Sequence, residues 1–433
     1  MNKTFALISL GCAKNLVNSE QMLYLMSEAG YELISEAENA DVVIINTCGF
    51  IDAAKNEALD AIFETSQVNG NIIVTGCLAE RYKDEIIEEL PEVKAFLGVC
   101  SYDEIVSAAD SILAGDRYSS FKDNSSPIDE LPRVISTGPS WAYLRIAEGC
   151  NNFCSFCAIP YIRGRYRSRK MENIIDEARD LAEHGIRELI VIAQDITRYG
   201  TDLYGKRSLA LLCRRLSEIE GIEWIRLHYL YPDQFDDELI KEIASNDKIV
   251  KYLDIPIQHI NNSILKKMNR RGTGEEIRSL FQKLREKIPG LVLRTSLIAG
   301  LPGESEAEFT ELCEFLKEAK IERAGVFPFS PEEGTPAALM EHCSFEEAQR
   351  RADFIMSEIQ SPIMDDFCNS FIGKTIRVLT EYEEQDGSLV GRCYADSPDI
   401  DGAVCFSGDC IEGDFANVLI EGAEDGILYG REV

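Results

Sequence analysis

The sequence predicts an α/β protein built from three consecutive parts, and three observations point to this fold class. Two long stretches alternate short β-branched segments with helical patterns, which is typical of parallel sheets. A polar, proline-punctuated segment separates them, as expected of a linker. After residue 367 the chain changes to short strands with glycine-rich turns. The expected parts are an N-terminal parallel α/β sheet domain (1–118), a linker (119–136), a central partial (β/α)6 barrel (137–366) and a small antiparallel β-barrel (367–433).

The N-terminal domain is expected to contain a wound parallel sheet. Strand patterns occupy residues 5–10, 42–46 and 71–75, and helical patterns occupy residues 19–29 and 53–65. Right-handed crossovers would place the helices on the faces of the sheet. The carboxyl ends of the strands should therefore share one edge.

The central part continues the alternation and predicts the barrel. Its strand patterns lie at residues 143–147, 188–193, 224–230, 252–257, 291–298 and 325–329. Active sites of such barrels lie at the C-terminal ends of the strands, so residues directly after each strand are the candidates for a site. The patterns that predict the C-terminal barrel lie at residues 374–380, 389–394, 416–420 and 426–429.

The amino-acid composition limits which class of binding partner and which cellular compartment we expect. The 44 Lys and Arg against 75 Asp and Glu give a net charge of -31, which repels phosphate backbones and favours a basic partner. The 14 cysteines are spread over a long chain, which favours reduced thiols or metal ligands over disulfides. Apolar runs fall well short of the ~20 residues of a membrane span, and the run before Cys12 is too short for a lipoprotein signal. We expect a soluble, cytoplasmic protein.

A loop after the first barrel strand carries cysteines at the spacing C-x3-C-x2-C. Cys150, Cys154 and Cys157 on one tight loop can each bind one iron of a 4Fe–4S cluster, which leaves the fourth iron open. This loop resembles the cluster loop of radical-SAM enzymes, in which S-adenosylmethionine (SAM) chelates the open iron. A zinc loop is the alternative, but zinc normally takes four ligands, and no nearby Cys or His completes such a set.

A second set of cysteines is widely spaced but occupies equivalent positions. Cys12, Cys48 and Cys77 each follow one of the N-terminal strands, so they should lie on one edge of the sheet, where neighbouring strands are about 4.8 Å apart. Each is next to a glycine, which allows the backbone to approach a bulky group; these are Gly11, Gly49 and Gly76. We expect a second three-cysteine cluster, with ordinary buried cysteines as the alternative.

The other eight cysteines are interpreted as reduced, structural thiols: Cys100, Cys213, Cys313, Cys343, Cys368, Cys393, Cys405 and Cys410. The last three share the C-terminal barrel, so a metal site there is the alternative.

With these two cysteine sets, the sequence resembles the radical-SAM methylthiotransferases over essentially the whole chain. The segment from Ser9 to Glu20, with Cys12 inside it, is similar to the opening of the branch that modifies an aspartate of small-subunit ribosomal protein twelve. Family members commonly have proline where Ala13 stands, a difference that alters the stiffness of the loop but removes no ligand. The resemblance implies an auxiliary-cluster domain, a radical-SAM core and an OB-like TRAM domain at the C-terminus.

The resemblance also implies the chemistry and the partners. Two 4Fe–4S clusters and two SAM molecules are implied: one SAM supplies a methyl group to sulfur on the auxiliary cluster, and the other is cleaved to a radical that removes hydrogen from the β-carbon of the aspartate. No catalytic residue is assigned beyond the cluster ligands. The implied partners are the basic ribosomal protein, a low-potential electron donor such as flavodoxin or ferredoxin, and a sulfur donor, with no membrane.

A tRNA adenosine methylthiotransferase is the alternative, because that branch shares both clusters and all three domains. The net charge of the C-terminal part favours one of these two substrates over the other. Residues 367–433 contain 14 Asp and Glu against 4 Lys and Arg, a net charge of -10 on the domain that should bind phosphates in a tRNA enzyme. A basic ribosomal protein fits this charge better than tRNA does.

Residues directly after the barrel strands are the candidates for SAM binding. They are Gln194 and Asp195 after the second strand, Gly300 and Gly303 after a later one, and Phe156 in the cluster loop. An ordinary βα turn explains the glycines equally well.

Four arginines alternate just after the cluster loop and would face one side of an extended chain. Arg163 and Arg165, with Arg167 and Arg169, could bind the carboxylate of SAM or of a substrate aspartate, or pair with surface acids. His259, after the strand at 252–257, could face the site or be structural.

Overall fold

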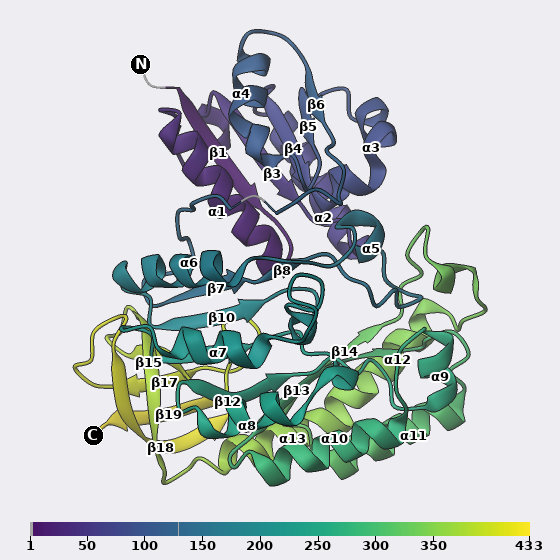
Figure 1. Cartoon of the computed structure of the whole chain (residues 1–433), viewed down its shortest axis with the longest axis vertical. Helices are drawn as coiled ribbons and strands as arrows, with labels where there is room; N and C mark the ends of the chain where they lie inside the picture. Colours follow the sequence, from purple (N-terminus) through teal and green to yellow (C-terminus); the bar gives the residue numbers. More distant parts are fainter. Residues whose placement is uncertain (1–2, 129) are drawn as a thin grey trace. The chain divides into compact units, whose positions relative to one another are not determined.

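The structure is a computed structural model that describes residues 3–128 and 130–433. The chain forms two compact units (Figure 1). The first unit contains Met1–Ser136, Ala147–Arg169 and Ser330–Ala338. The second contains Thr137–Ile146, Lys170–Phe329 and Leu339–Val433. The cysteine loop after residue 149 therefore belongs to the same unit as the N-terminal sheet.

The first unit is built on a six-stranded parallel sheet with the order β2-β1-β3-β4-β5-β6. The strands are β1 (Thr4–Ser9), β2 (Glu32–Leu33), β3 (Val42–Thr47), β4 (Ile72–Gly76), β5 (Ala95–Leu97) and β6 (Tyr118–Ser120). The predicted strands at 5–10, 42–46 and 71–75 are confirmed as β1, β3 and β4.

Helices cover both faces of this sheet, as the crossover argument predicts. They are α1 (Ala13–Glu28), α2 (Asp52–Ser66), α3 (Cys77–Glu89) and α4 (Ile105–Leu113). Side chains alternate between the faces: Val42 and Ile44 pack under α1 and α4, whereas Val43 and Ile45 pack under α2 and α3. Each face therefore has its own apolar core.

The sheet extends into the segment predicted as a linker, because β6 pairs with β5. The sequence patterns did not predict β6, because this short strand at the edge of the sheet contains two serines. The later residues are irregular but anchored. The carboxylate of Glu20, which is buried in α1, accepts hydrogen bonds from Arg133 at 2.5 Å and from the backbone N–H of Ser136 at 2.8 Å.

Two shorter segments complete the first unit. The ribbon of β8 (Ala147–Glu148) and β9 (Arg167–Ser168) flanks the cysteine loop and the short helix α5 (Ile159–Ile162). Residues 330–338 return to this unit after the last strand of the central sheet.

The second unit contains a parallel sheet with the order β14-β13-β12-β11-β10-β7, which confirms the predicted partial barrel. The strands are β7 (Trp141–Arg145), β10 (Glu188–Ile192), β11 (Trp224–Leu227), β12 (Ile249–Asp254), β13 (Val292–Ala299) and β14 (Arg323–Pro328). Strands that are consecutive along the chain are neighbours in the sheet, as in a singly wound βα barrel.

Helices connect these strands and continue beyond them. They are α6 (Met171–Glu183), α7 (Leu209–Ser217), α8 (Asp237–Ser245), α9 (Asn262–Lys267), α10 (Gly274–Lys287), α11 (Glu306–Ala319), α12 (Phe345–Ile355) and α13 (Ser361–Asn369). Capping boxes at Thr273 and Ser305 start α10 and α11 by pairing with Glu276 and Glu308. Within the described residues, no helix has both the length and the apolar character that a membrane span requires.

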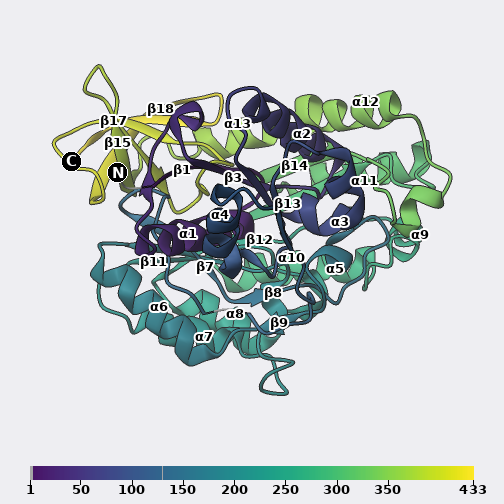
Figure 2. The same cartoon turned by 90° about the horizontal axis from the view of Figure 1, so that it is seen from above.

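The C-terminal residues form a closed five-stranded barrel with the order β15-β16-β17-β19-β18. The strands are β15 (Thr375–Glu383), β16 (Leu389–Cys393), β17 (Val404–Ser407), β18 (Phe415–Glu424) and β19 (Ile427–Glu432). The predicted barrel is confirmed, with β17 as a strand that the sequence patterns did not single out. Figure 2 shows its yellow strands beside α13, which contacts β18.

Buried charges join the C-terminal barrel to the central sheet. Glu188, at the start of β10, accepts hydrogen bonds from Arg226 and from Arg392, both at 2.7 Å. Burial opposes its ionisation, but the two guanidinium groups hold the pKa of Glu188 below its usual range. Trp224 adds an edge-to-face contact with Phe415, with ring centroids 4.8 Å apart. The barrel is thus attached through paired charges as well as apolar packing.

We expect Arg392→Met to destabilise the second unit by about 3 kcal/mol, because half of the buried Glu188 carboxylate loses its partner. Urea unfolding followed by far-ultraviolet circular dichroism measures this. Arg431→Met is the matched control, since Arg431 pairs with Glu421 on the barrel surface, where such pairs contribute about 0–1 kcal/mol. Equal shifts in the two variants would contradict a structural role for the buried network.

Candidate iron–sulfur sites

Three cysteines follow three neighbouring strands of the first unit's sheet. Cys12 directly precedes α1, Cys48 follows β3, and Cys77 is the first residue of α3. The strands β1, β3 and β4 are adjacent, and Ser9 lies opposite Asn46 near the ends of β1 and β3. Parallel strands lie about 4.8 Å apart. The turns that carry the three thiols therefore lie side by side.

Two glycines let these turns come into contact. Gly11 has a φ of +92°, and a Cβ on it would lie 2.7 Å from the Cβ of Cys48. A Cβ on Gly49 would lie 2.7 Å from the Cα of Leu78, which follows Cys77. The close approach predicted for these glycines is therefore between the cysteine turns themselves.

Hydrogen bonds fix the same edge of the sheet. The side-chain amide of Asn46 donates to the carbonyl of Asn15 at 2.9 Å and to the hydroxyl of Ser19 at 2.8 Å. The amide of Asn15 donates to the carbonyl of Thr47 at 3.1 Å. Gly76, with a φ of +97°, is also required, because a Cβ there would lie 2.5 Å from the carbonyl oxygen of Thr47. The turn after each strand is thus tied to its neighbour.

A buried arginine lies beside these thiols. Arg163 is 3% exposed and donates to the carboxylate of Glu148 at 2.9 Å and to the side-chain oxygen of Asn15 at 3.0 Å. Desolvation opposes ionisation of Cys12, but the charges of Lys14 and Arg163 outweigh it and lower the pKa of that thiol. Burial raises the pKa of Cys77, and Arg163 opposes this rise through its charge and a hydrogen bond.

Cys48 receives less of this support, because Arg163 is the smallest of the influences on it. Burial and the neighbouring Cys77 raise its pKa to about 11. The three thiols are close enough to influence one another's ionisation, so a cation that takes up their negative charge suits the site.

The second cysteine set lies on a compact loop of the same unit. Gly149 has a φ of +74°, and a Cβ there would lie 2.2 Å from the carbonyl oxygen of Arg165. The N–H of Cys150 donates to the carbonyl of Gly164 at 3.1 Å, and the N–H of Cys157 donates to that of Cys154 at 3.0 Å. The loop is closed on itself, with its cysteines at the ends of short backbone turns.

Helix α5 connects the two cysteine sets. It begins two residues after Cys157, and Ala158 and Ile162 pack against Cys77. Arg163 is the C-cap of this helix. A helical turn therefore leads from the cysteine loop to the buried arginine at the N-terminal thiols.

Residues 330–338 contact both sets as well. The N–H of Ala337 donates to the carbonyl of Ser155 at 2.9 Å, inside the cysteine loop. Glu332 pairs with Arg81 at 3.1 Å, and Arg81 donates to the carbonyl of Gly49 at 2.8 Å. One segment thus holds the loop of Cys154 and the turn of Cys48.

Both cysteine sets consist of free thiols. All 14 cysteines are free thiols and lie within the described residues. In that part of the chain, no group of three or more His, Cys, Asp or Glu side chains is placed to hold one metal ion. In a 4Fe–4S cluster each thiolate binds a different iron.

Two of the three cysteines of the C-terminal barrel have polar contacts within the barrel. Cys393 is buried on β16 and contacts Asp396 at 3.0 Å, whereas Cys410 contacts the hydroxyl of Thr380 at 3.3 Å. The absence of a three-residue metal group applies to these described residues too.

The four arginines after the loop do not form the row expected of an extended chain. The end of α5 and the positive φ of Gly164 turn the backbone, so Arg163 points to Glu148 and Arg169 to Glu130. Arg165 is exposed, with its guanidinium 4.4 Å from the ring centroid of Phe153. Arg167 donates to backbone carbonyls, among them that of Arg165 at 2.9 Å.

The candidates of the second unit lie in tightly packed turns. Asp195 accepts from the N–H of Thr197 at 3.1 Å and pairs with Arg198 at 3.0 Å, which makes it the N-cap of the turn after β10. Gln194, next to it, is half-buried. Phe156, in the first unit's cysteine loop, is also half-buried.

The glycine turn after β13 has a structural reason of its own. Gly300 has a φ of +78°, and a Cβ on it would lie 2.5 Å from the Cβ of Ala348 on α12. Gly303 has a φ of +82°, and a Cβ there would clash with the end of the Lys267 side chain. These glycines are required by the packing of the turn, whether or not a ligand approaches.

His259 lies beside this glycine turn. Its Nδ1 accepts the N–H of Asn261 at 3.0 Å, and its Nε2 lies 3.2 Å from Glu304. The other carboxylate oxygen of Glu304 accepts from the N–H of Gly300 at 2.9 Å and from Arg351 at 2.8 Å. The buried His259 thus lies against Glu304, the residue that binds the backbone of the glycine turn.

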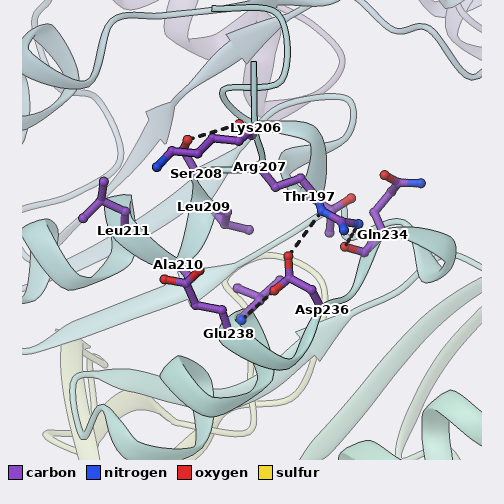
Figure 3. Close-up of a pocket in the computed structure, with 11 residues that line it drawn as sticks. Thr197, Lys206, Arg207, Ser208, Leu209, Ala210, Leu211, Gln234, Asp236 and Glu238 are labelled. Carbon is purple, nitrogen blue, oxygen red and sulfur yellow. Dashed lines mark hydrogen bonds and ion pairs between the residues drawn. The ribbon is translucent and has the colours of Figure 1, made fainter. Parts of the chain in front are cut away.

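A surface pocket lies between the starts of α7 and α8 (Figure 3). Arg207 in its lining donates to the carbonyl of Gln234 at 3.0 Å and pairs with Asp236 at 3.2 Å. The candidates Gln194 and Asp195 do not line it. Residues at or near the starts of two helices line the pocket, and no cysteine is among them.

Comparison with known proteins identifies the family. Family models match residues 4–98 (uncharacterized protein family UPF0004), 144–316 (radical SAM superfamily) and 372–433 (TRAM domain). A relative from Acetivibrio thermocellus, named ribosomal protein uS12 methylthiotransferase RimO, is 47% identical over 100% of this chain and 99% of its own. A RimO from Caldanaerobacter subterraneus subsp. tengcongensis is 46% identical over 99% of this chain and 100% of its own.

The chain belongs to the RimO family of radical-SAM methylthiotransferases. Membership implies SAM and 4Fe–4S cofactors. Among solved structures, the radical SAM methyltransferase TsrM from Kitasatospora setae has a similar fold, with a TM-score of 0.59 at 14% identity over 78% of this chain and 74% of that one. The tRNA-modifying alternative is not favoured, since the relatives named above carry the uS12 name.

Sequence patterns missed several residues at the sites of this RimO-family chain. Glu148, Asn15 and Glu332 surround the cysteine turns, but none stands next to a cysteine in the sequence. Asn15 lies inside the segment that resembles the family, and this position is the signal by which the sequence could have identified it. The approach of Glu332 depends on the tertiary fold.

The predicted ligand role of Cys12 and Cys48 can be tested at Gly11. We expect Gly11→Ala to lower iron binding at the N-terminal site several-fold, because its Cβ would force the turn of Cys48 away. Iron and sulfide are counted in a chain whose Cys150, Cys154 and Cys157 are all alanine. Gly30→Ala is the matched control: Gly30 has a similar φ of +85°, but a Cβ there meets nothing within 4 Å. Equal losses would mean that backbone strain, and not crowding at Cys48, causes the effect.

Proposed function

We propose that this protein attaches a methylthio group to the β-carbon of an aspartate in ribosomal protein uS12. The observation that carries this proposal is the 47% identity over the full chain to a relative named for that reaction. Two sets of three cysteines, one at strand ends and one on a closed loop of the same compact unit, support this proposal.

The ligands of two separate clusters form the second part of the proposal. Cys150, Cys154 and Cys157 would hold the cluster that binds SAM, and the cysteines of the N-terminal turns would hold the auxiliary cluster. Three free thiols per site leave one iron of each cluster open. The cation Arg163 and the glycine contacts at the N-terminal site support this arrangement.

The bound cofactors supply the radical and the methylthio group. The chain's own residues bind and orient them and exclude water. Arg163 and Glu148 hold the N-terminal turns against α5, and Glu304 fixes the glycine turn for which we propose a SAM contact. Arg165 is the candidate for the carboxylate of the substrate, because it is exposed and supported by Phe153 in the cysteine loop. A low-potential flavodoxin or ferredoxin and a sulfur donor complete the proposed system.

The surface of the C-terminal barrel supports a basic protein as substrate over RNA. The structure describes all of residues 367–433, and Arg392, one of the four basic residues there, is buried against Glu188. Arg377 and Arg431 pair with Glu223 and Glu421. The acidic surface of the C-terminal barrel would attract a basic ribosomal protein and repel phosphates.

Iron counting tests the two-cluster assignment. We expect about eight iron atoms per chain in the anaerobically reconstituted protein, and about four when either three-cysteine set is replaced by alanine. Replacing Cys213, a buried thiol on α7, is the control and should leave the count unchanged. A full count without Cys12, Cys48 and Cys77 would refute the auxiliary site.

The substrate is tested by offering uS12 or unmodified tRNA in parallel, with SAM, a low-potential reductant and sulfide. Mass spectrometry should find one methylthio group on an aspartate of uS12 and none on the tRNA. The Cys154→Ala chain should give no product, because it lacks a ligand of the SAM-binding cluster. Modified tRNA with unmodified uS12 would reverse the assignment.

A further inference from the structure

We infer that Arg163 is an electrostatic positioning residue of the auxiliary site, where its fixed positive charge stabilises the reduced form of the cluster. This inference rests on the proposed cluster at Cys12, Cys48 and Cys77. It goes beyond the ligand assignment, because it concerns how a residue from the radical-SAM loop region sets the properties of the other cluster.

Arg163 is held in one orientation from three directions. Glu148 on β8 accepts from its Nη1 at 2.9 Å, and Asn15 in the first turn of α1 accepts from its Nη2 at 3.0 Å. Asn18, one turn later, lies 3.5 Å from Nη1. The backbone N–H of Arg163 donates to Ile159 at 2.8 Å and closes α5. A buried guanidinium with this many partners is preorganised and cannot turn away from the thiols.

Charged groups around the thiols include Arg163, whose charge acts on two of them. Arg163 acts electrostatically on Cys12 and Cys77. Glu148 is the carboxylate paired with it, and it adds a negative charge that acts on Cys77 as well. Lys14 is the other cation that acts on Cys12. Arg163 and Lys14 are thus the cations that act on these thiols, and Glu148 is the carboxylate beside them.

Reduction adds one electron to the cluster. A nearby positive charge and hydrogen bonds to cluster sulfurs both favour the reduced form and raise the reduction potential. Loss of Arg163 should therefore lower the potential of the auxiliary cluster. A residue that only filled space at the end of α5 would not move it in a charge-dependent way.

The test uses the full chain with Cys150, Cys154 and Cys157 replaced by alanine, so that only the auxiliary cluster is present. Arg163→Met and Arg163→Lys are compared with this parent by iron counting and by a redox titration followed by electron paramagnetic resonance. Arg169→Met is the matched control, because Arg169 is also a buried arginine paired with a carboxylate, Glu130, and follows the same loop.

We expect Arg163→Met to bind iron and to titrate at a lower potential than the parent, with Arg163→Lys between them and Arg169→Met unchanged. If Arg163→Met binds no iron, retention by Arg163→Lys supports the role of the charge. The inference is overturned if Arg163→Met keeps the parent's potential, if methionine and lysine have equal effects, or if Arg169→Met shifts as far. A parent chain without iron would instead refute the auxiliary cluster itself.

Discussion

One steric constraint shapes the cysteine turns of the first unit: the turns at the ends of adjacent parallel strands lie so close together that a side chain between them is excluded. The sheet sets the spacing between strands, and only a residue without a Cβ fits between the turn of Cys12 and that of Cys48. The asparagine and serine contacts around Asn46 then hold this edge in one arrangement. The amino acids next to the cysteines are thus as restricted as the cysteines themselves.

Burying charge is the second constraint, and both units meet it in the same way. An arginine or glutamate removed from water is costly unless its partners replace the lost hydration. Glu188 has two guanidinium partners in the second unit, and Arg163 has a carboxylate and two asparagine oxygens in the first. In the second unit the pairs attach the C-terminal barrel to the central sheet. In the first unit the cation remains beside thiols whose ionisation it favours.

The periodicity of apolar residues predicted most of the fold, because buried strands such as β3 and β10 are continuous β-branched runs. It missed β6 and β17, which are short strands that contain polar residues and depend on their neighbours for pairing. The cysteine positions at strand ends were predictable from the same pattern. The partners of Arg163 were not, because Arg163 and Asn15 are 148 positions apart and the turn at Gly164 breaks the expected alternation.

The first unit is discontinuous, and this has a consequence for its biosynthesis. Arg81 can pair with Glu332 only after most of the chain has been synthesised. The same holds for the hydrogen bond from the N–H of Ala337 to the carbonyl of Ser155. A nascent or truncated chain that ends before residue 330 lacks the clamp on both cysteine turns. The clamp on the two cysteine turns can therefore form only when synthesis of the chain is nearly complete.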